Sequence, residues 1–274
     1  MTTAARDRRL FMVAGAVIAT VSVIWSALTL AGVSVGTAHR DQHRVLRGSF
    51  RQLSIDAASA DVTVVAAAGS RVTVDSRASG SLWLPKLRTT VAGDQVSVEG
   101  GCRLSTGNSC HAALVLHVPP RTALRIHAND GDVTVRGLSA RVDVENGSGD
   151  IGGDQLSGPV FLRSRAGDLD VTDLGGKATL ESSAGDIRAG QLTGADVSAD
   201  ASAGDVDLDF TAPPTRVDAV SAAGDVRVTV PDDGTSYAVD TTTSARDVAI
   251  RTDPDAARRI HAASSAGTVA IGYP

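Results

Sequence analysis

The feature that most constrains this chain is a short phrase that returns seven times between residues 130 and 247. In six of the returns Gly is followed by Asp and then by an aliphatic residue, and in the seventh Arg246 stands before the Asp. Successive aspartates are 18, 18, 18, 19, 20 and 22 residues apart, and a degenerate eighth return, Gly267-Thr268-Val269, puts Thr268 another 21 residues on. A fixed period of this size is typical of a repeat array. The repeated aspartates are Asp132, Asp150, Asp168, Asp186, Asp205, Asp225 and Asp247.

Each repeat contains two segments in which apolar and polar residues alternate. The first follows the Asp directly, as in Val133 and Val135, and the second supplies another alternate pair, as in Val142 and Val144. Successive side chains on a strand point to opposite faces, so each pair forms one apolar stripe. A single coil cannot bury that stripe, whereas stacked coils bury it continuously. The sequence therefore predicts an all-β fold, a β-helix-like β-solenoid with coils of about 18–22 residues.

The composition agrees with a narrow interior. Hydrophobic residues make up 42% of the chain but aromatic residues only 3%, so the core must consist of small aliphatic side chains. The net charge of −5 leaves no basic footprint of the kind that binds nucleic acid.

The repeated aspartates have two interpretations. Stacking would bring them about 4.8 Å apart, where bare like charges in water repel by about 1 kcal/mol per pair. Each carboxylate can accept hydrogen bonds from turn N–H groups, with the preceding Gly supplying an unusual backbone conformation. Alternatively, the column binds a hard cation such as Ca²⁺. The calcium-binding pattern Gly-Gly-x-Gly-x-Asp is missing, which favours the turn role, and we expect no metal ligand or cofactor.

The N-terminus predicts a membrane anchor. Arg6, Arg8 and Arg9 precede an uncharged run over residues 10–37, long enough for a transmembrane helix. Positive charge before the run predicts a cytoplasmic N-terminus and an extracytoplasmic C-terminal domain. A cleaved signal peptide ending near Gly36-Thr37-Ala38 is the alternative, although its apolar region would be shorter. We expect a tail over 1–9, a single-pass helix over 10–37, a polar linker over 38–48, an N-terminal β region over 49–127 and the Gly-Asp solenoid over 128–274.

The only two cysteines, Cys102 and Cys110, bracket a turn rich in Gly, Ser and Asn. In an exported domain this arrangement predicts a disulfide that closes a hairpin loop. The competing zinc site lacks a second pair of ligands.

Catalytic motifs are poorly represented. The six histidines are scattered without metal-binding spacing, and no phosphate-binding glycine loop or nucleophile elbow is present. We expect no catalytic residues and no enzyme activity. The later repeats are longer, and their extra residues form candidate partner-binding loops, for which polar corners that only keep the array soluble are the alternative. The loop residues singled out are Arg216, Asp232, Asp233, Asp253 and Asp255.

An ordered set of motifs resembles a known family. Leu82-Trp83-Leu84-Pro85-Lys86, Gly93-Asp94-Gln95-Val96-Ser97-Val98, the cysteine loop and Val118-Pro119 precede the Gly-Asp repeats. Together they resemble the bacterial putative-adhesin domain family of unknown function, over most of residues 50–274. The resemblance implies a β-solenoid behind one membrane helix in the bacterial cell envelope. Arg246 in place of Gly and Thr268 in place of Asp depart from the pattern, so we expect irregular last coils.

These observations predict a non-enzymatic, adhesin-like binding surface at the bacterial cell membrane, with cell-wall polymer as a candidate partner. The alternative is an envelope-stress sensor or scaffold that assembles with membrane proteins. A polysaccharide-active β-helix enzyme ranks third, because the first three coils spare no residues for the long loops that build a cleft.

Overall fold

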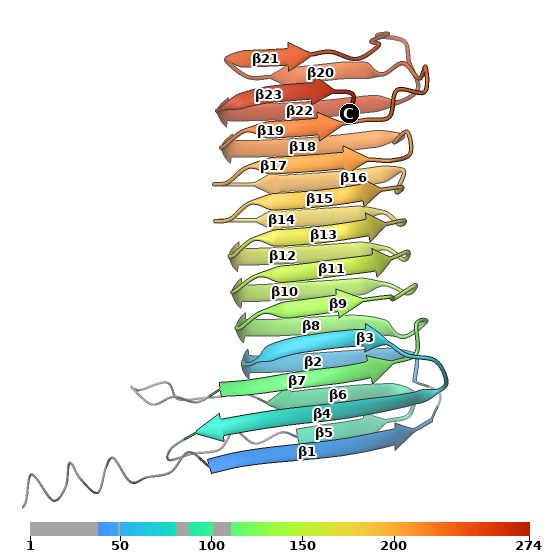
Figure 1. The fold of residues 1–274 in the computed structure, drawn as a ribbon, viewed down its shortest axis with the longest axis vertical. Coiled ribbons are helices and arrows are strands. Elements are labelled where there is room, and N and C mark those ends of the chain that lie inside the picture. The colour runs from blue at the N-terminus through green and yellow to red at the C-terminus, as the bar shows by residue number, and fades with distance from the viewer. Residues whose placement is uncertain (1–37, 49, 81–87, 101–110) are drawn as a thin grey trace, which may run out of the picture.

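The computed structural model describes residues 38–48, 50–80, 88–100 and 111–274. Within these ranges all 23 regular elements are strands, and they form two long sheets that face each other along one stack (Figure 1). The predicted all-β solenoid is therefore confirmed. No helix among the described residues is long and apolar enough to cross a membrane, and the predicted span over residues 10–37 lies outside them.

One sheet, called sheet A, contains the strand that follows each repeated Asp. Its spatial order is β1 (Ala38–Arg47), β4 (Arg71–Gly80), β7 (His111–Val118), β3 (Asp61–Ala66), β9 (Val133–Arg136), β11 (Ile151–Leu156), β13 (Leu169–Leu174), β15 (Ile187–Leu192), β17 (Val206–Phe210), β19 (Val226–Thr229), β23 (Thr268–Gly272) and β21 (Ala245–Val248).

The opposite sheet, called sheet B, contains the second strand of each repeat. Its spatial order, read from the other end, is β20 (Ala238–Thr242), β22 (Arg259–Ala266), β18 (Arg216–Ala223), β16 (Asp196–Ala201), β14 (Ala178–Ser182), β12 (Val160–Ala166), β10 (Val142–Ser148), β8 (Ala123–Asp130), β2 (Gln52–Ser59), β6 (Gln95–Gly100) and β5 (Arg88–Ala92).

A coil is one strand of sheet B followed by one strand of sheet A. Neighbouring coils pair in parallel and in register, so that Val142 lies beside Val160 and Ile151 beside Leu169. The aliphatic pairs predicted from the alternation are buried between the two sheets. The narrow core is therefore one continuous column of Val, Leu, Ile and Ala, as the low aromatic content requires.

The last two residues of the central sheet A strands β11, β13 and β15 turn the chain at a corner and have their own conformational requirement. Gln155, Asp173 and Gln191 have φ of 55°, in the left-handed region that L-residues rarely adopt. Each is followed by a fully buried leucine, which fills the corner between the sheets; these are Leu156, Leu174 and Leu192. The left-handed residue therefore turns the chain while the next side chain closes the core.

At both ends of the stack the coils are out of chain order. At the N-terminal end the coil β2/β3 lies between β6/β7 and β8/β9. At the C-terminal end the last coil in sequence, β22/β23, lies between β18/β19 and β20/β21. At each end of the stack, the coil that is first or last in sequence is thus the second coil from the end rather than the outermost one.

Two expected segment boundaries differ in the structure. Residues 38–48, predicted as a polar linker, instead form strand β1 over Ala38–Arg47, which pairs antiparallel with β4. The boundary expected after residue 127 falls inside β8, because the coils of residues 50–127 belong to the same stack as the Gly-Asp repeats. Polar composition misled the first expectation, since an edge strand at the end of a stack exposes much of its surface.

Candidate functional site

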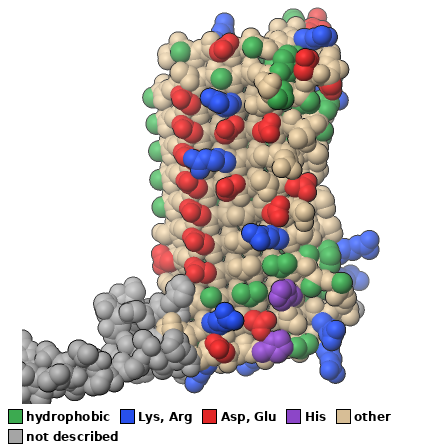
Figure 2. Space-filling view, viewed as in Figure 1, with side chains coloured by type: hydrophobic (Ala, Val, Ile, Leu, Met, Phe, Trp, Pro, Cys, Tyr) green, Lys and Arg blue, Asp and Glu red, His purple; other side chains and the backbone are tan. Residues whose placement is uncertain are grey.

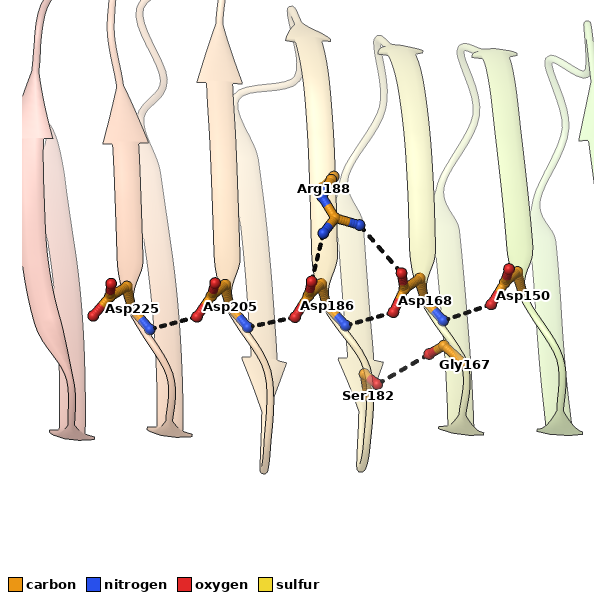
Figure 3. A network of polar contacts seen from close by, with 8 residues as sticks. All are labelled: Asp150, Gly167, Asp168, Ser182, Asp186, Arg188, Asp205 and Asp225. Carbon is orange, nitrogen blue, oxygen red and sulfur yellow. Dashed lines mark hydrogen bonds and ion pairs between the residues drawn. The ribbon is translucent and has the colours of Figure 1, made fainter.

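Six of the seven repeated aspartates, Asp132 to Asp225, form a continuous hydrogen-bonded ladder along the N-terminal ends of the sheet A strands. The Oδ1 atom of each Asp accepts the backbone N–H of the Asp one coil further on. In Figure 3 the N–H of Asp168 donates to Asp150 at 2.9 Å, and that of Asp205 donates to Asp186 at 2.8 Å. The predicted role as acceptors of turn N–H groups is confirmed, but the donor belongs to the neighbouring coil rather than to the same turn.

The glycine before each ladder Asp is required by a close backbone approach. Gly131, Gly149, Gly167, Gly185, Gly204 and Gly224 all have positive φ, between 107° and 152°. A Cβ atom added at Gly185 would lie 2.2 Å from the carbonyl oxygen of Gly167, closer than nonbonded atoms can approach. Only glycine allows the two coils to approach this closely, which explains the Gly-Asp phrase.

A second column, inside the stack, was not predicted from the sequence. Buried polar side chains on sheet B donate to the carbonyl oxygens of the ladder glycines: Asn146 to Gly131, Ser164 to Gly149, Ser182 to Gly167, Ser221 to Gly204 and Ser264 to Gly224. The signal in the sequence is a Ser or Asn three residues before the glycine in these repeats. These bonds satisfy carbonyl groups at the turn, and unsatisfied buried carbonyls would destabilise the fold.

The ladder leaves the second oxygen of each carboxylate to face outward. Arg188 uses two of these oxygens, because its guanidinium donates to Oδ2 of Asp168 and to Oδ2 of Asp186 (Figure 3). The hydrogen bond to Asp168 and the charge of Asp186 raise the pKa of Arg188 above its usual value. Backbone donors and interposed arginine thus offset the repulsion expected between stacked carboxylates.

The ladder passes to the last coil through Thr268. The N–H of Thr268 lies 2.7 Å from Oδ1 of Asp225, and the Thr268 hydroxyl donates to the same oxygen at 2.9 Å. These two hydrogen bonds lower the pKa of the Asp225 carboxyl below its ordinary value. The expected irregularity of the last coils therefore takes the form of a substitution within the ladder combined with a change in coil order.

The assignment of Asp247 to the repeat column is wrong. In the outermost coil Ala245 lies beside Thr268 and Asp247 lies beside Ala270, so Asp247 is two residues away from the ladder position. The residue before Asp247 is Arg246, which cannot make the close approach that the ladder requires of glycine. The spacing alone placed Asp247 in the column, and the missing glycine was the signal against it.

The ladder also has one member outside the 18- to 22-residue period. Oδ1 of Asp61 accepts the N–H of Asp132 at 3.1 Å, so the column extends into the coil β2/β3. The sequence Ala60-Asp61-Val62-Thr63-Val64 differs from Gly131-Asp132-Val133-Thr134-Val135 only at its first residue. Asp61 lies 71 residues before Asp132, so a period of 18 to 22 residues does not include it.

The outward faces of the two sheets carry different charge patterns. Beside the ladder on sheet A a second row alternates in sign, with Asp170, Arg188, Asp207 and Arg227 in register on successive coils (Figure 2 shows the aspartate column and the arginines among it). On sheet B opposite charges pair across coils, as in Arg163 and Glu181 at 2.7 Å. Ion pairs therefore join neighbouring coils at several places on sheet B, whereas on the central coils of sheet A Arg188 pairs with Asp168 and Asp186.

The candidate partner-binding loops gather at the C-terminal end of the stack. Asp232 and Asp233 lie between β19 and β20, Asp253 and Asp255 lie between β21 and β22, and Arg216 begins β18. Two of the aspartates stabilise their own loops: Asp233 accepts the N–H of Thr235 at 3.0 Å, and Asp253 accepts that of Asp255 at 2.9 Å.

Arg258, just before β22, joins two of the loops: its guanidinium donates to the carbonyl oxygens of Pro213 and Pro214, before β18, at 2.7 and 2.9 Å. The local contacts give the loops a structural role.

Two further predictions concern metal and disulfide chemistry. Among the described residues, no group of three or more His, Cys, Asp or Glu side chains is arranged to hold a metal ion. Cys102 and Cys110 lie outside the described residues.

A stack of parallel coils joined by glycine turns and an aspartate ladder defines the class of Gly-Asp repeat β-solenoids. The chain belongs to the Toastrack DUF4097 family, whose model matches residues 50–270. This match confirms the family membership predicted from the motifs.

Solved structures from several bacteria match the chain. A putative adhesin from Bacteroides fragilis is 16% identical, with a TM-score of 0.49 and coverage of 87% of this chain and 97% of that one. A putative cell adhesion protein from Clostridium sporogenes is 8% identical, with a TM-score of 0.32 and coverage of 86% and 100%. A putative lipid binding protein from Parabacteroides distasonis is 13% identical, with a TM-score of 0.31 and coverage of 86% and 97%. No curated protein matches the chain at a significant level.

Proposed function

We propose that this protein is a membrane-anchored, extracytoplasmic binding surface of the bacterial cell envelope, in which the outer face of sheet A contacts a long polymer of the cell wall. The envelope setting is what the resemblance of the motifs implies, and the apolar run over residues 10–37 with arginines before it supports the anchor. The proposal assigns no catalytic step to the chain.

The observation that carries the proposal is the regular spacing of exposed charge on sheet A. The ladder carboxylates keep one oxygen bound to backbone N–H groups and turn the other outward, so their positions are fixed. The neighbouring row alternates Asp170, Arg188, Asp207 and Arg227, one residue per coil. Hydrogen-bond acceptors and donors are thus repeated at the spacing of neighbouring strands, about 4.8 Å.

This arrangement suits a partner that is itself long and repetitive. Sugar hydroxyls donate to carboxylate oxygens, and guanidinium groups donate to carbonyl or carboxylate oxygens of a wall polymer. Because the coils hold the side chains at fixed spacing, little protein ordering opposes binding. Many weak contacts along one face then add up through multivalency.

Charge reversal on the two faces tests the proposal. The full-length protein in nanodiscs is incubated with purified wall polymer, and the retained protein is measured by cosedimentation. We expect Asp170→Lys with Asp207→Lys on sheet A to reduce retention by about tenfold or more. The change removes two hydrogen-bond acceptors and places positive charge on both sides of Arg188. The matched control, Asp200→Lys with Asp218→Lys, changes two exposed aspartates of sheet B and should leave retention unchanged.

Equal losses in the two double variants would show that binding depends on net charge rather than on the face of sheet A. Absence of wild-type retention would contradict the polymer as partner. Cross-linking of the native membrane, followed by mass spectrometry, addresses the alternative role. Capture of specific membrane proteins without wall polymer would favour the sensor or scaffold.

A further inference from the structure

The two ends of the exported chain differ strongly in charge. Residues 38–128 contain 11 Lys and Arg against six Asp and Glu, a net charge of +5. Residues 129–274 contain 12 Lys and Arg against 24 Asp and Glu, a net charge of −12. The overall charge of −5 conceals this division, and the basic part is the one that follows the predicted membrane span.

The basic charge is concentrated on the three strands that end the stack, β1, β4 and β5, which lie at the bottom of Figure 1. Together these strands carry six arginines and two aspartates. One of the two, Asp75, is already paired with His43 across β1 and β4. All six arginines are exposed: Arg40, Arg44, Arg47, Arg71, Arg77 and Arg88.

The same end exposes apolar side chains. Val45 on β1 is 44% exposed and Val91 on β5 is 49% exposed, and they are the large hydrophobic residues that the described part of the chain leaves open to solvent. They lie on the edge strands of the two different sheets, so both sheets present an apolar residue at this end. Exposed aliphatic side chains among arginines match the boundary between lipid headgroups and acyl chains, where phosphates and apolar surface lie close together.

The position of β1 places this end of the stack next to the predicted membrane span. The strand starts at Ala38, directly after the predicted span over residues 10–37, so no linker separates the two. One residue of extended chain covers at most about 3.6 Å, and the ten-residue strand is about 33 Å long. A strand that starts at the membrane surface can therefore lie along it.

We propose that the end formed by β1, β4 and β5 is a lipid-contacting surface, on which the arginines bind the phosphate groups of anionic lipids in the membrane that holds the anchor. Arginine pairs well with phosphate through two parallel N–H donors. The acidic coils then project away from the bilayer, because the negatively charged lipids repel them. This inference rests on the anchor of the proposed function but is independent of the polymer partner.

Photo-cross-linking in nanodiscs tests the contact. A benzophenone amino acid replaces Val45, or Ala257 at the opposite end as a distal control, in the full-length protein. The nanodiscs contain either phosphatidylcholine alone or phosphatidylcholine mixed with labelled phosphatidylglycerol. We expect lipid cross-links from position 45 and none above background from position 257. The triple variant Arg40→Glu, Arg44→Glu and Arg47→Glu should reduce the yield with phosphatidylglycerol by about tenfold or more.

A second triple variant, Arg136→Glu, Arg165→Glu and Arg227→Glu, makes the same charge change on exposed residues of the coils and should keep the wild-type yield. Salt gives a test without mutation, since about 1 M NaCl should weaken the contact. Equal labelling from positions 45 and 257 while the protein stays in the nanodisc would overturn the lipid surface and leave the anchor intact. Cross-links from position 45 to a second copy of the chain would overturn it in favour of an end-to-end dimer. Release of the wild-type chain by alkaline carbonate would remove the anchor and this inference with it.

Discussion

The central coils and the C-terminal coils use the same turn but differ in which residue of the turn is retained. From β10 to β19 every turn has both the glycine and the aspartate. Further on, the turn before β23 keeps Gly267 but has Thr268 in place of Asp, whereas the strand β21 keeps Asp247 but has Arg246 in place of Gly. Thr268 joins the ladder and Asp247 does not. Of these two turns, the one that keeps the glycine therefore joins the ladder, and the one that keeps only the aspartate does not.

The most severe test of this comparison is to add one methyl group at the close approach. A Cβ at Gly267 would lie 2.1 Å from the carbonyl oxygen of Gly224, and one at Gly185 would lie 2.2 Å from that of Gly167. Because backbone must move to relieve either overlap, Gly185→Ala and Gly267→Ala should each lower the free energy of unfolding by about 3 kcal/mol or more. Denaturant unfolding of the full-length protein, followed by circular dichroism, measures the change.

Two variants serve as controls for that experiment. Gly190→Ala adds a methyl group whose nearest neighbour is Cγ2 of Thr172 at 3.9 Å, and Arg246→Gly restores the Gly-Asp phrase in sequence at a residue that lies beside Val269, outside the ladder turn. Both should stay within about 1 kcal/mol of wild type. If Gly267→Ala behaved like Gly190→Ala, the last coil would not occupy the place between β19 and β21.

Replacement of aspartate by alanine compares Asp186, which belongs to the ladder, with Asp247, which follows the sequence spacing but lies outside the ladder. Asp186 accepts the N–H of Asp205 at 2.8 Å and pairs with Arg188. Asp186→Ala should therefore cost about 1–2 kcal/mol of stability, whereas Asp247→Ala should change it by about 0.5 kcal/mol or less. Thermal melting of both variants measures the difference, and equal effects would contradict the assignment of Asp247 outside the ladder.

The interior hydroxyl column should have a smaller effect. Ser221→Ala removes the 2.8 Å hydrogen bond to the carbonyl oxygen of Gly204 and should cost about 1 kcal/mol in thermal or denaturant unfolding. Ser202→Ala is the matched control and should be neutral, because Ser202 is an exposed serine in the neighbouring coil. The native Ala201 occupies a place in the column itself, beside Ser182 and Ser221, which limits the expected loss. A loss of several kcal/mol would mean that the column supports more than one turn.

The sequence predicted the unit of this fold better than its order. The signals in the sequence are local: an alternating pair such as Val133 and Val135, together with a glycine turn, predicts that a segment forms a coil with one apolar stripe. Every coil carries the same stripe, so the pattern cannot say which two coils are neighbours. That choice depends on long-range pairing, as where Val226 lies beside Val269 rather than beside a residue of β21. The donor to each carboxylate was missed for the same reason, because a local Asx turn and an inter-coil bond require the same Gly-Asp phrase.

Acid titration gives the smallest effect and tests the end of the ladder. The N–H and hydroxyl of Thr268 lower the pKa of Asp225, so the carboxylate is favoured in the folded state over the unfolded state. A lowered folded pKa contributes stability that is complete above the unfolded value of about 3.9 and is lost as the pH falls through the folded value. Thr268→Val keeps the backbone donor and removes the hydroxyl, so the melting temperature should fall less steeply with acid below about pH 4 than in the wild type. Thr229→Val on β19 is the control and should leave the slope unchanged. If Thr268→Val also left the slope unchanged, the hydroxyl would not bind Asp225. The backbone N–H alone would then continue the ladder into the last coil.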